Sequence, residues 1–446
     1  MEEILMNLVY GVKDKPKFGQ MLVFAFQQIL AILAATIAVP SIIGNGMSQS
    51  AALFGAGVGT LVYQLFTKRN SPVFLGSSFA FIGSMFAAFG GAASTAAGYA
   101  GLIIGAGFAG LVYVIIALVV KVAGVNWINK LMPPVVIGPT VAIIGLSLAG
   151  NAVGDLTTGR VAGCSPYVAL ICGLVTLFAV IFFSVYGKKM AKLIPFILGI
   201  LAGYVVAAIF TAIGIATGNA ALQVIDFSVF ANMGIVSLPD FTFMMAAKGL
   251  KDIDGAFIAT VAVAYVPVAF VVFAEHIADH KNLSTIIGSD LLENPGLHNT
   301  LLGDGIGSFV GAFFGGCPNT TYGESVGCVA ITGNASVSTI VIAAIYCILL
   351  SFFDPFVTFL ASIPNCVMGG VCITLYGFIA VSGLKMIQKV NLGASKNLFV
   401  VSAILIPGIG GLSVSFADGK VTLTTIACAL ILGILANVML SKGKED

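Results

Sequence analysis

Charged residues are scarce in this sequence. Only 9% of the 446 residues are Asp, Glu, Lys or Arg, whereas 59% are hydrophobic. Since soluble proteins carry charge at about 25% of their positions, so few charges cannot cover the water-facing surface of a chain this long. The formal net charge of +2 also provides no basic face for a nucleic acid. Composition therefore excludes a soluble globular enzyme, a disordered chain and a nucleic-acid-binding module, and favours a protein surrounded mainly by lipid.

Motifs of metal chemistry are also missing. The 8 cysteines include no Cys-x-x-Cys pair, and the sequence contains no His-Glu-x-x-His motif. We interpret the cysteines as small buried hydrophobic residues. We therefore expect no cofactor, no bound metal and no enzymatic activity.

Long apolar segments account for most of the chain. A helix needs about 20 apolar residues to span a bilayer, and fourteen segments of suitable character can be marked. They lie at residues 17–40, 48–67, 73–90, 95–122, 132–151, 165–187, 191–214, 255–280, 297–316, 318–332, 337–353, 356–384, 395–415 and 421–441. The sequence thus predicts a polytopic membrane protein in which a polar stretch near 215–254 forms the longest loop.

The distribution of basic residues predicts the orientation in the membrane. With the N-terminus in the cytoplasm and fourteen alternating spans, 16 of the 20 Lys and Arg residues fall inside. The remaining 4, which fall outside, are Arg160, Lys248, Lys251 and Lys420. Because cytoplasmic loops are enriched in Lys and Arg, this asymmetry favours fourteen spans with both termini in the cytoplasm.

The two halves of the chain resemble each other. LFGAGVGTLV at 53–62 matches LLGDGIGSFV at 301–310, and MPPVVIG at 132–138 matches IPNCVMG at 363–369. Pro72 and Pro318 each open a segment that is interrupted by polar and glycine residues, at 72–84 and 318–332. The offsets correspond to seven predicted spans, and an odd number turns the second copy upside down in the membrane. Inverted repeats with interrupted helices at matching positions are typical of secondary transporters.

The two interrupted segments are the best candidates for a ligand site. Backbone outside a helix is tolerated at membrane depth where it lines a cavity or is covered by protein. A half-helix that starts there presents free N–H groups and the positive end of its dipole. Two such half-helices, one from each half of the chain, can therefore point at one small ligand.

Four carboxylates lie in or beside apolar segments, where charged groups are costly and mark functional sites. Glu275 follows a long apolar run, and Asp279 lies one helical turn later on the same face. Asp304 interrupts the second glycine-rich repeat where the first repeat has Ala56, and Glu324 opens the second half-helix. Desolvation favours the neutral form of a carboxyl group, so these acids are candidates for carrying a proton.

Other polar residues near these carboxylates are expected to be structural. We predict that His280 is solvated near the cytoplasmic interface and that His276 is a packing residue on a different face from Glu275. Gln27 and Gln28, in the first apolar segment, are expected to hydrogen-bond to neighbouring helices.

Three sequence stretches carry a resemblance to a known family. They are LGSSFAF at 75–81, AEH at 274–276, and PNTTYGE followed by SVGCVAITG at 318–333. Over almost its whole length the chain resembles the nucleobase–ascorbate transporter family, and within it the uracil branch, since the purine branch usually has Gln where Glu324 stands. The family signature maps onto Glu324, Ser325, Gly327, Thr332 and Gly333, with Ser325 in place of the usual Asn. Asp279 stands where near members of the uracil branch have His.

The resemblance implies a fold and a domain organisation. It implies an all-α polytopic membrane protein of fourteen transmembrane segments in two inverted seven-helix repeats, with short antiparallel strands in segments 3 and 10. A core domain would comprise residues 17–122 and 255–353, and a gate domain residues 132–214 and 356–441. The protein would be a homodimer in the cell membrane.

The resemblance also implies a function and a site. Uracil would be imported by symport with H⁺, through an elevator or rocking movement of the core against the gate. The expected substrate-binding residues are Phe79, Glu275, Tyr322, Gly323 and Glu324, with Tyr376 as a second ring that could cover the base. The expected proton-coupling residues are Glu275, Asp279 and Asp304, with Glu275 as the main coupling acid. The sequence shows no clear cation cage, which favours H⁺ over Na⁺ without deciding between them.

Two other functions remain open at this point. A xanthine or purine permease of the same family differs from a uracil permease only in its substrate. An anion transporter of the same fold needs a basic residue or dipole ends at its site, and both arginines, Arg69 and Arg160, fall in predicted loops. The pair of carboxylates therefore favours a neutral base over an anion.

Overall fold

The structure is a computed structural model that describes residues 8–124, 127, 133–188, 190–231, 233–416 and 421–440. Helices dominate, as expected of a chain in lipid, where each backbone N–H and C=O group must be satisfied within its own segment. Within the described residues, 7 helical segments are long and apolar enough to cross a membrane. They are Phe18–Ile43, Thr95–Ala123, Pro134–Asp155, Pro166–Tyr186, Pro195–Thr217, Gly255–Ile287 and Asn365–Ile387. The prediction of a mostly helical, multi-pass membrane protein is confirmed.

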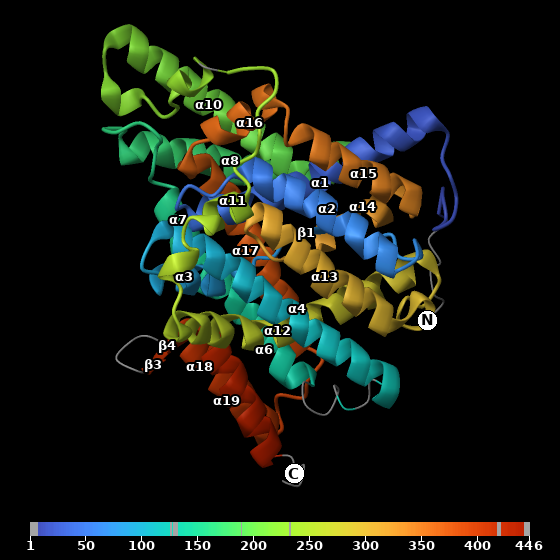
Figure 1. Ribbon diagram of the computed structural model, residues 1–446. Coiled ribbons are helices and arrows are strands. Elements are labelled where there is room, and N and C mark those ends of the chain that lie inside the picture. The colour runs from blue at the N-terminus through green and yellow to red at the C-terminus, as the bar shows by residue number, and fades with distance from the viewer. Residues whose placement is uncertain are drawn as a thin grey trace.

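One group of elements packs around helix α13. The group comprises α1 (Phe18–Ile43), α2 (Gln49–Phe66), β1 (Leu75–Ser77), α3 (Ile82–Gly90), α4 (Thr95–Ala123), α12 (Gly255–Ile287), η4 (Leu292–Gly296), α13 (Leu297–Gly315), β2 (Asn319–Thr321), α14 (Gly323–Thr332) and α15 (Val337–Leu350). Helix α13 packs against α2 and α4, and α15 packs against α1 and α2. Figure 1 shows these early and late segments of the chain side by side.

A second group packs around helix α17. It comprises α6 (Pro134–Ser147), α7 (Ala149–Asp155), α8 (Pro166–Tyr186), α9 (Met190–Leu193), α10 (Pro195–Thr217), α17 (Asn365–Ile387), α18 (Ser395–Ile409), β3 (Val414–Phe416), β4 (Val421–Leu423) and α19 (Thr425–Leu440). Helix α17 packs against α6 and α8, while α18 packs against α6 and α19. The expected boundaries at residues 132 and 441 lie outside the described residues.

Short elements connect the two groups. The predicted loop near 215–254 contains η1 (Ala220–Leu222), η2 (Phe227–Phe230), α11 (Thr242–Ala247) and η3 (Leu250–Asp252), and α16 (Asp354–Ser362) precedes α17. Helix α11 packs on α4 and α13, whereas η1 packs on α10, so this stretch contacts both groups.

The glycine-rich repeats contact each other directly. A Cβ atom added at Gly59 would lie 2.7 Å from the carbonyl oxygen of Gly307, and one at Gly307 would lie 2.8 Å from the carbonyl oxygen of Gly59. Such a distance leaves no room for a side chain on either helix, so glycine is required for the close approach of α2 and α13. Gly59 and Gly307 occupy matching positions in the two repeats.

The two interrupted segments pair as short strands. Strands β1 and β2 are antiparallel, with Leu75 opposite Thr321 and Gly76 opposite Thr320. The Leu75 N–H donates to Oγ1 of Thr60 at 2.9 Å, and Nδ2 of Asn319 donates to the carbonyl of Gly55 at 3.0 Å. The first bond satisfies a buried strand N–H group through a side chain from the middle of α2, and the second ties β2 to the same helix.

The fold contains a second strand pair that the sequence analysis did not predict. Strands β3 and β4 pair antiparallel, with Val414 opposite Leu423. They occupy the ends of two segments, 395–415 and 421–441, that were predicted as continuous spans. The prediction was wrong there because α18 ends at Ile409 and α19 begins only at Thr425.

Candidate functional site

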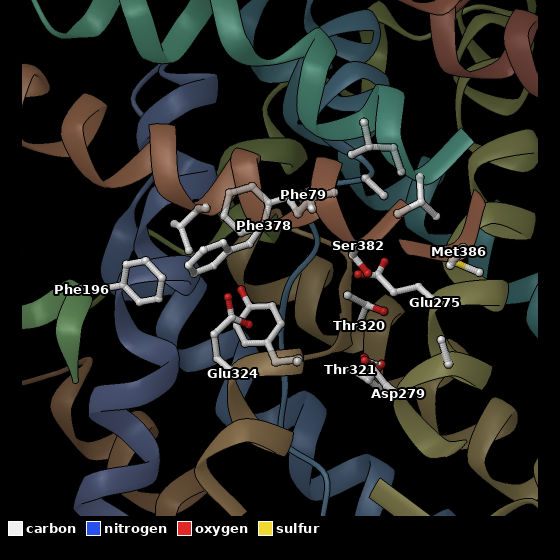
Figure 2. Close-up of a pocket in the computed structure, with 18 residues that line it drawn as sticks. Phe79, Phe196, Glu275, Asp279, Thr320, Thr321, Glu324, Phe378, Ser382 and Met386 are labelled. Atoms are coloured by element: carbon white, nitrogen blue, oxygen red, sulfur yellow. Dashed lines mark hydrogen bonds between the residues drawn. The ribbon is translucent and has the colours of Figure 1, made fainter. Parts of the chain in front are cut away.

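A cavity of about 380 Å³ lies between the two groups of elements. One group contributes the segment before α3, together with α12, β2 and α14, and the other contributes α6, α10 and α17. The residues are Phe79, Ala80, Val141, Ile144, Phe196, Glu275, Ala278, Asp279, Thr320, Thr321, Tyr322, Gly323, Glu324, Leu375, Phe378, Ile379, Ser382 and Met386. Figure 2 shows Glu275 and Asp279 on one side of this cavity and Glu324 on the other.

Helix α12 brings two carboxylates to the cavity. Glu275 and Asp279 both line it, as their spacing of one helical turn predicts. Oγ1 of Thr321 donates a hydrogen bond to Oδ2 of Asp279 at 2.6 Å, and this bond ties α12 to strand β2. Among the described residues, none hydrogen-bonds to the Glu275 carboxylate. Because a carboxylate in a partly dry cavity needs donors, Glu275 is free to accept one from a ligand.

The third carboxylate lies at the start of a half-helix. Helix α14 begins at Gly323, directly after β2, and Glu324 lies in its first turn. The first N–H groups of a helix have no partner within it, and the dipole makes this end positive. Gly323 leaves this end open, because a Cβ atom added there would meet nothing within 4 Å. Carboxylate acceptors and the N-terminal end of a helix thus line the same cavity.

Aromatic rings cover part of the cavity. Phe79 lines it directly, and behind Phe79 lies Tyr376, whose ring is 5.9 Å away at 77°. Tyr376 itself does not line the cavity, so it packs against Phe79 instead of covering a ligand. Tyr322 lines the cavity and donates its hydroxyl hydrogen to the carbonyl oxygen of Ser77 at 2.8 Å. The Tyr322 ring passes over Gly76, where a Cβ atom would collide with it.

Residues from the second group form a wall that the sequence analysis missed. Phe196 on α10, and Phe378, Ser382 and Met386 on α17, complete the lining of the cavity from this group. In Figure 2, Ser382 and Met386 are on the same side as Glu275, and Phe196 is on the same side as Glu324. Their sequence signal is weak, since apolar side chains in an apolar helix look alike whether they face lipid or a ligand. Ser382 is the exception, because a polar residue within α17 marks one face of that helix.

Asp304 lies outside the cavity lining, although it was predicted to act beside Glu275. It is fully buried in α13, where its Oδ2 is 2.7 Å from Nδ1 of His276. His280 is also fully buried, with its Nε2 2.7 Å from the hydroxyl of Tyr63. The expectation that His280 is solvated was therefore wrong. His276 is buried as expected of a packing residue, but it also contacts the side chains of Asp304 and Thr300. The apolar sequence before His276 gave no indication that this face of α12 packs against polar side chains of α2 and α13.

Ser325 has a structural role beside the site. Nε2 of Gln28 donates to its Oγ, which confirms the predicted bond between helices for that residue. The stretch Gly323–Gly327 reads Gly-Glu-Ser-Val-Gly, the spacing of a hydrolase nucleophile elbow. In the structure Ser325 is fully buried within α14 and also accepts from the backbone N–H of Phe74, so it is not an exposed nucleophile. Within the described part of the chain, no cluster of three or more His, Cys, Asp or Glu residues has the arrangement of a metal site.

Solved structures of two other transport proteins share this fold. The transmembrane domain of the cyanobacterial bicarbonate transporter BicA aligns with a TM-score of 0.65 and 17% identity, covering 96% of this chain and 100% of that one. Murine Slc26a9, an anion transporter, aligns with a TM-score of 0.68 and 10% identity, covering 96% of this chain and 69% of that one. Identities this low establish a common architecture and no common substrate.

Curated relatives are much closer in sequence. A uracil permease of Bacillus caldolyticus is 39% identical, over 97% of this chain and 94% of the relative. Uracil permeases of Bacillus subtilis and Escherichia coli K12 are 35% and 33% identical, over 98% and 95% of this chain and 96% and 92% of the relatives. A sequence profile described as Permease family (Xan_ur_permease) matches residues 19–417. The site described above therefore lies in a chain that belongs to this permease family.

Proposed function

We propose that this protein is a secondary active transporter that imports uracil across the cytoplasmic membrane together with H⁺. One observation carries the proposal: Glu275 and Glu324 line a single small cavity in which a half-helix also begins. The relatives that match almost the whole chain are named uracil permeases, which supports uracil as the substrate.

The chemistry of the cavity suits a flat, uncharged heterocycle. Uracil has two ring N–H donors and two carbonyl acceptors. Carboxylates accept from N–H groups, and the free backbone N–H groups at the start of α14 donate to carbonyls. Each polar atom left unpaired in the cavity would cost about 1–3 kcal/mol, so this pairing selects for the base. A volume of about 380 Å³ falls within the usual range for small-molecule sites, and Phe79 can lie against the ring.

Proton coupling fits the same residues. Glu275 is the main coupling acid in this proposal because it faces the cavity without a hydrogen-bond partner among the described residues. Asp279, held by Thr321, is the second acid in the cavity. Carrying a bare charge through the membrane is costly, so protonation of Glu275 would permit the loaded site to cross. Asp304 belongs to the predicted set as well, but it lies outside the cavity lining.

The proposed movement is an elevator or rocking motion. In it, the group around α13 forms the core and carries the base past the gate, which is the group around α17. The location of the cavity between the groups supports this division. The reciprocal contact of Gly59 and Gly307, and the pairing of β1 with β2, support two inverted repeats related by an axis near these contacts. We further propose cytoplasmic termini, from the distribution of basic residues, and a homodimer.

Uptake of radiolabelled uracil into proteoliposomes tests the substrate. We expect accumulation under an inward H⁺ gradient, with strong competition by 5-fluorouracil, weaker competition by thymine and none by xanthine. Competition by xanthine in place of the pyrimidines would instead identify a purine carrier. Accumulation that follows a Na⁺ gradient at constant pH would contradict the proton-coupled part of the proposal.

A further inference from the structure

His276, Asp304 and Thr300 form a second polar cluster, which lies outside the cavity lining. Nδ1 of His276 is 2.7 Å from Oδ2 of Asp304, and Nε2 of His276 is 2.9 Å from Oγ1 of Thr300. All three side chains are fully buried. The contacts join α12, which carries Glu275 and Asp279, to α13.

Counting hydrogens indicates which atom donates in each contact. Thr300 has one hydroxyl hydrogen, which it donates to the carbonyl oxygen of Leu297 at 3.1 Å. Thr300 therefore accepts from His276, and the ring hydrogen lies on Nε2. A neutral imidazole has only one N–H, so Nδ1 is an acceptor, and its contact with Asp304 requires a hydrogen on the carboxyl group.

The other carboxyl oxygen of Asp304 supports this assignment. Oδ1 is buried and has no hydrogen-bond partner among the described residues. In an ionised carboxylate this oxygen would carry negative charge without a donor, at a cost of several kcal/mol. In a protonated carboxyl group it is a neutral carbonyl oxygen, which is far cheaper to leave unpaired. If Asp304 were ionised, its Oδ1 would remain unpaired whether His276 was neutral or charged.

Among the described residues, His276 is the only basic group in ion-pair contact with Asp304. The other titratable groups that face the pair are Tyr63 on α2, Tyr113 on α4, and Glu275, Asp279 and His280 on α12 itself. The His280 ring stacks on that of His276 at a centroid distance of 4.0 Å. None of these groups is in ion-pair contact with Asp304.

We propose that Asp304 is a positioning residue that remains protonated throughout the transport cycle and donates its hydrogen to His276. The inference rests on the proposed transport function and separates Asp304 from the acids that exchange protons. Its effect reaches the substrate through α12, because His276 and Glu275 are adjacent in the chain and point to different faces of that helix.

A second contact strengthens the hold on α12. Nδ1 of His280 donates to the carbonyl oxygen of His276 at 2.8 Å, and its Nε2 lies 2.7 Å from the hydroxyl of Tyr63 on α2. Both neighbours, α2 and α13, belong to the same packing group as α12. The polar face of α12 is therefore fixed within this group, and its opposite face holds Glu275 towards the cavity during movement.

Two substitutions of Asp304 test the proposal through transport. In Asp304→Asn, the side-chain NH₂ can still donate to His276, but no proton can be released. We expect this variant to accumulate uracil under an H⁺ gradient with the pH profile of the wild type. Asp304→Ala leaves Nδ1 of His276 without a donor, and we expect a KM for uracil about tenfold higher with the same pH profile. Asp304→Asn that retains uracil counterflow but loses gradient-driven accumulation would overturn the proposal, since Asp304 would then carry the coupling proton.

A spectroscopic measurement tests the proton directly and does not depend on transport. The chain has only 3 histidines, so ¹⁵N-histidine NMR of the purified wild type can be assigned with a His276→Gln variant. We expect a neutral His276 ring with its hydrogen on Nε2 across neutral pH. An imidazolium, or a hydrogen on Nδ1, would overturn the assignment even if Asp304→Asn failed to fold. Wild-type protein that transports no uracil would remove the proposed function and leave this result unaffected.

Discussion

Replacing Glu275 by Gln tests the central claim about the site. The substitution keeps the size of the side chain and one acceptor oxygen but removes the charge and the exchangeable proton. Since Glu275 faces the cavity without a hydrogen-bond partner among the described residues, the change should act on the ligand and leave the fold intact. We expect Glu275→Gln to abolish accumulation of uracil under an H⁺ gradient.

The loss of affinity can be worked out from the same contact. A hydrogen bond to a charged group contributes about 1.5–3 kcal/mol and a neutral one about 0.5–1.5 kcal/mol. The difference, about 1–1.5 kcal/mol, corresponds to roughly tenfold weaker binding of uracil. Counterflow of radiolabelled uracil, which needs no net proton movement, should therefore persist at a higher substrate concentration.

Proteoliposomes with an imposed pH gradient separate the two effects, because accumulation and counterflow are measured on the same preparation. Glu293→Gln is the matched control, since it makes the same chemical change at an exposed glutamate outside the cavity. Accumulation by Glu275→Gln at the level of Glu293→Gln would refute the assignment of Glu275 as the coupling acid. Loss of counterflow at saturating uracil would show that the substitution damages more than the proton step.

Three further substitutions test the packing and the walls of the site. Tyr322→Phe leaves the buried carbonyl oxygen of Ser77 without its donor and is expected to destabilise the protein by about 1–3 kcal/mol. Tyr265→Phe is the control, because it removes a buried hydroxyl that has no partner among the described residues. Equal melting temperatures for the two variants would argue against this reasoning. Gly59→Ala forces a methyl group against Gly307 and is expected to lower stability by about 1–3 kcal/mol in thermal melts. Gly83→Ala, where nothing lies within 4 Å, should melt like the wild type, and a Gly59→Ala protein that does so too would contradict the close approach of α2 and α13. Phe378→Ala removes part of the wall that α17 contributes to the cavity and is expected to raise uptake of bulky 5-substituted uracils relative to uracil. An unchanged ratio in competition assays would show that Phe378 does not limit the space.

Local chemistry made much of the site predictable. Proline followed by glycine and hydroxyl residues at 72–84 and 318–332 cannot continue a helix, and the structure has strands β1 and β2 there. Glu275, Asp279 and Glu324 were recognisable because carboxylates are rare among apolar residues, and all three line the cavity. These features needed only the identity of a residue and its immediate neighbours in the chain.

Features that depend on contacts between distant helices were not predictable in this way. The wall formed by Phe196 and Phe378 requires knowing which face of α10 and α17 meets the core. The environment of His280 depends on Tyr63, more than two hundred residues earlier in the chain.

The second hairpin is a different case, because the sequence between β3 and β4 contains an Asp-Gly pair flanked by Val, Thr and Phe residues. That pattern is typical of a hairpin, but the surrounding apolar character concealed it.

The division of the cavity has a consequence for how such carriers diversify. Every carboxylate that faces the cavity lies on elements of one group, whereas Phe196, Phe378 and Met386 come from the other. Substitutions of these apolar wall residues can therefore change the size of substrate that fits, while the carboxylates that would hydrogen-bond to the substrate keep their positions. Evolution or protein engineering can therefore change the range of accepted bases through substitutions in helices that carry none of the carboxylates proposed to couple transport to H⁺.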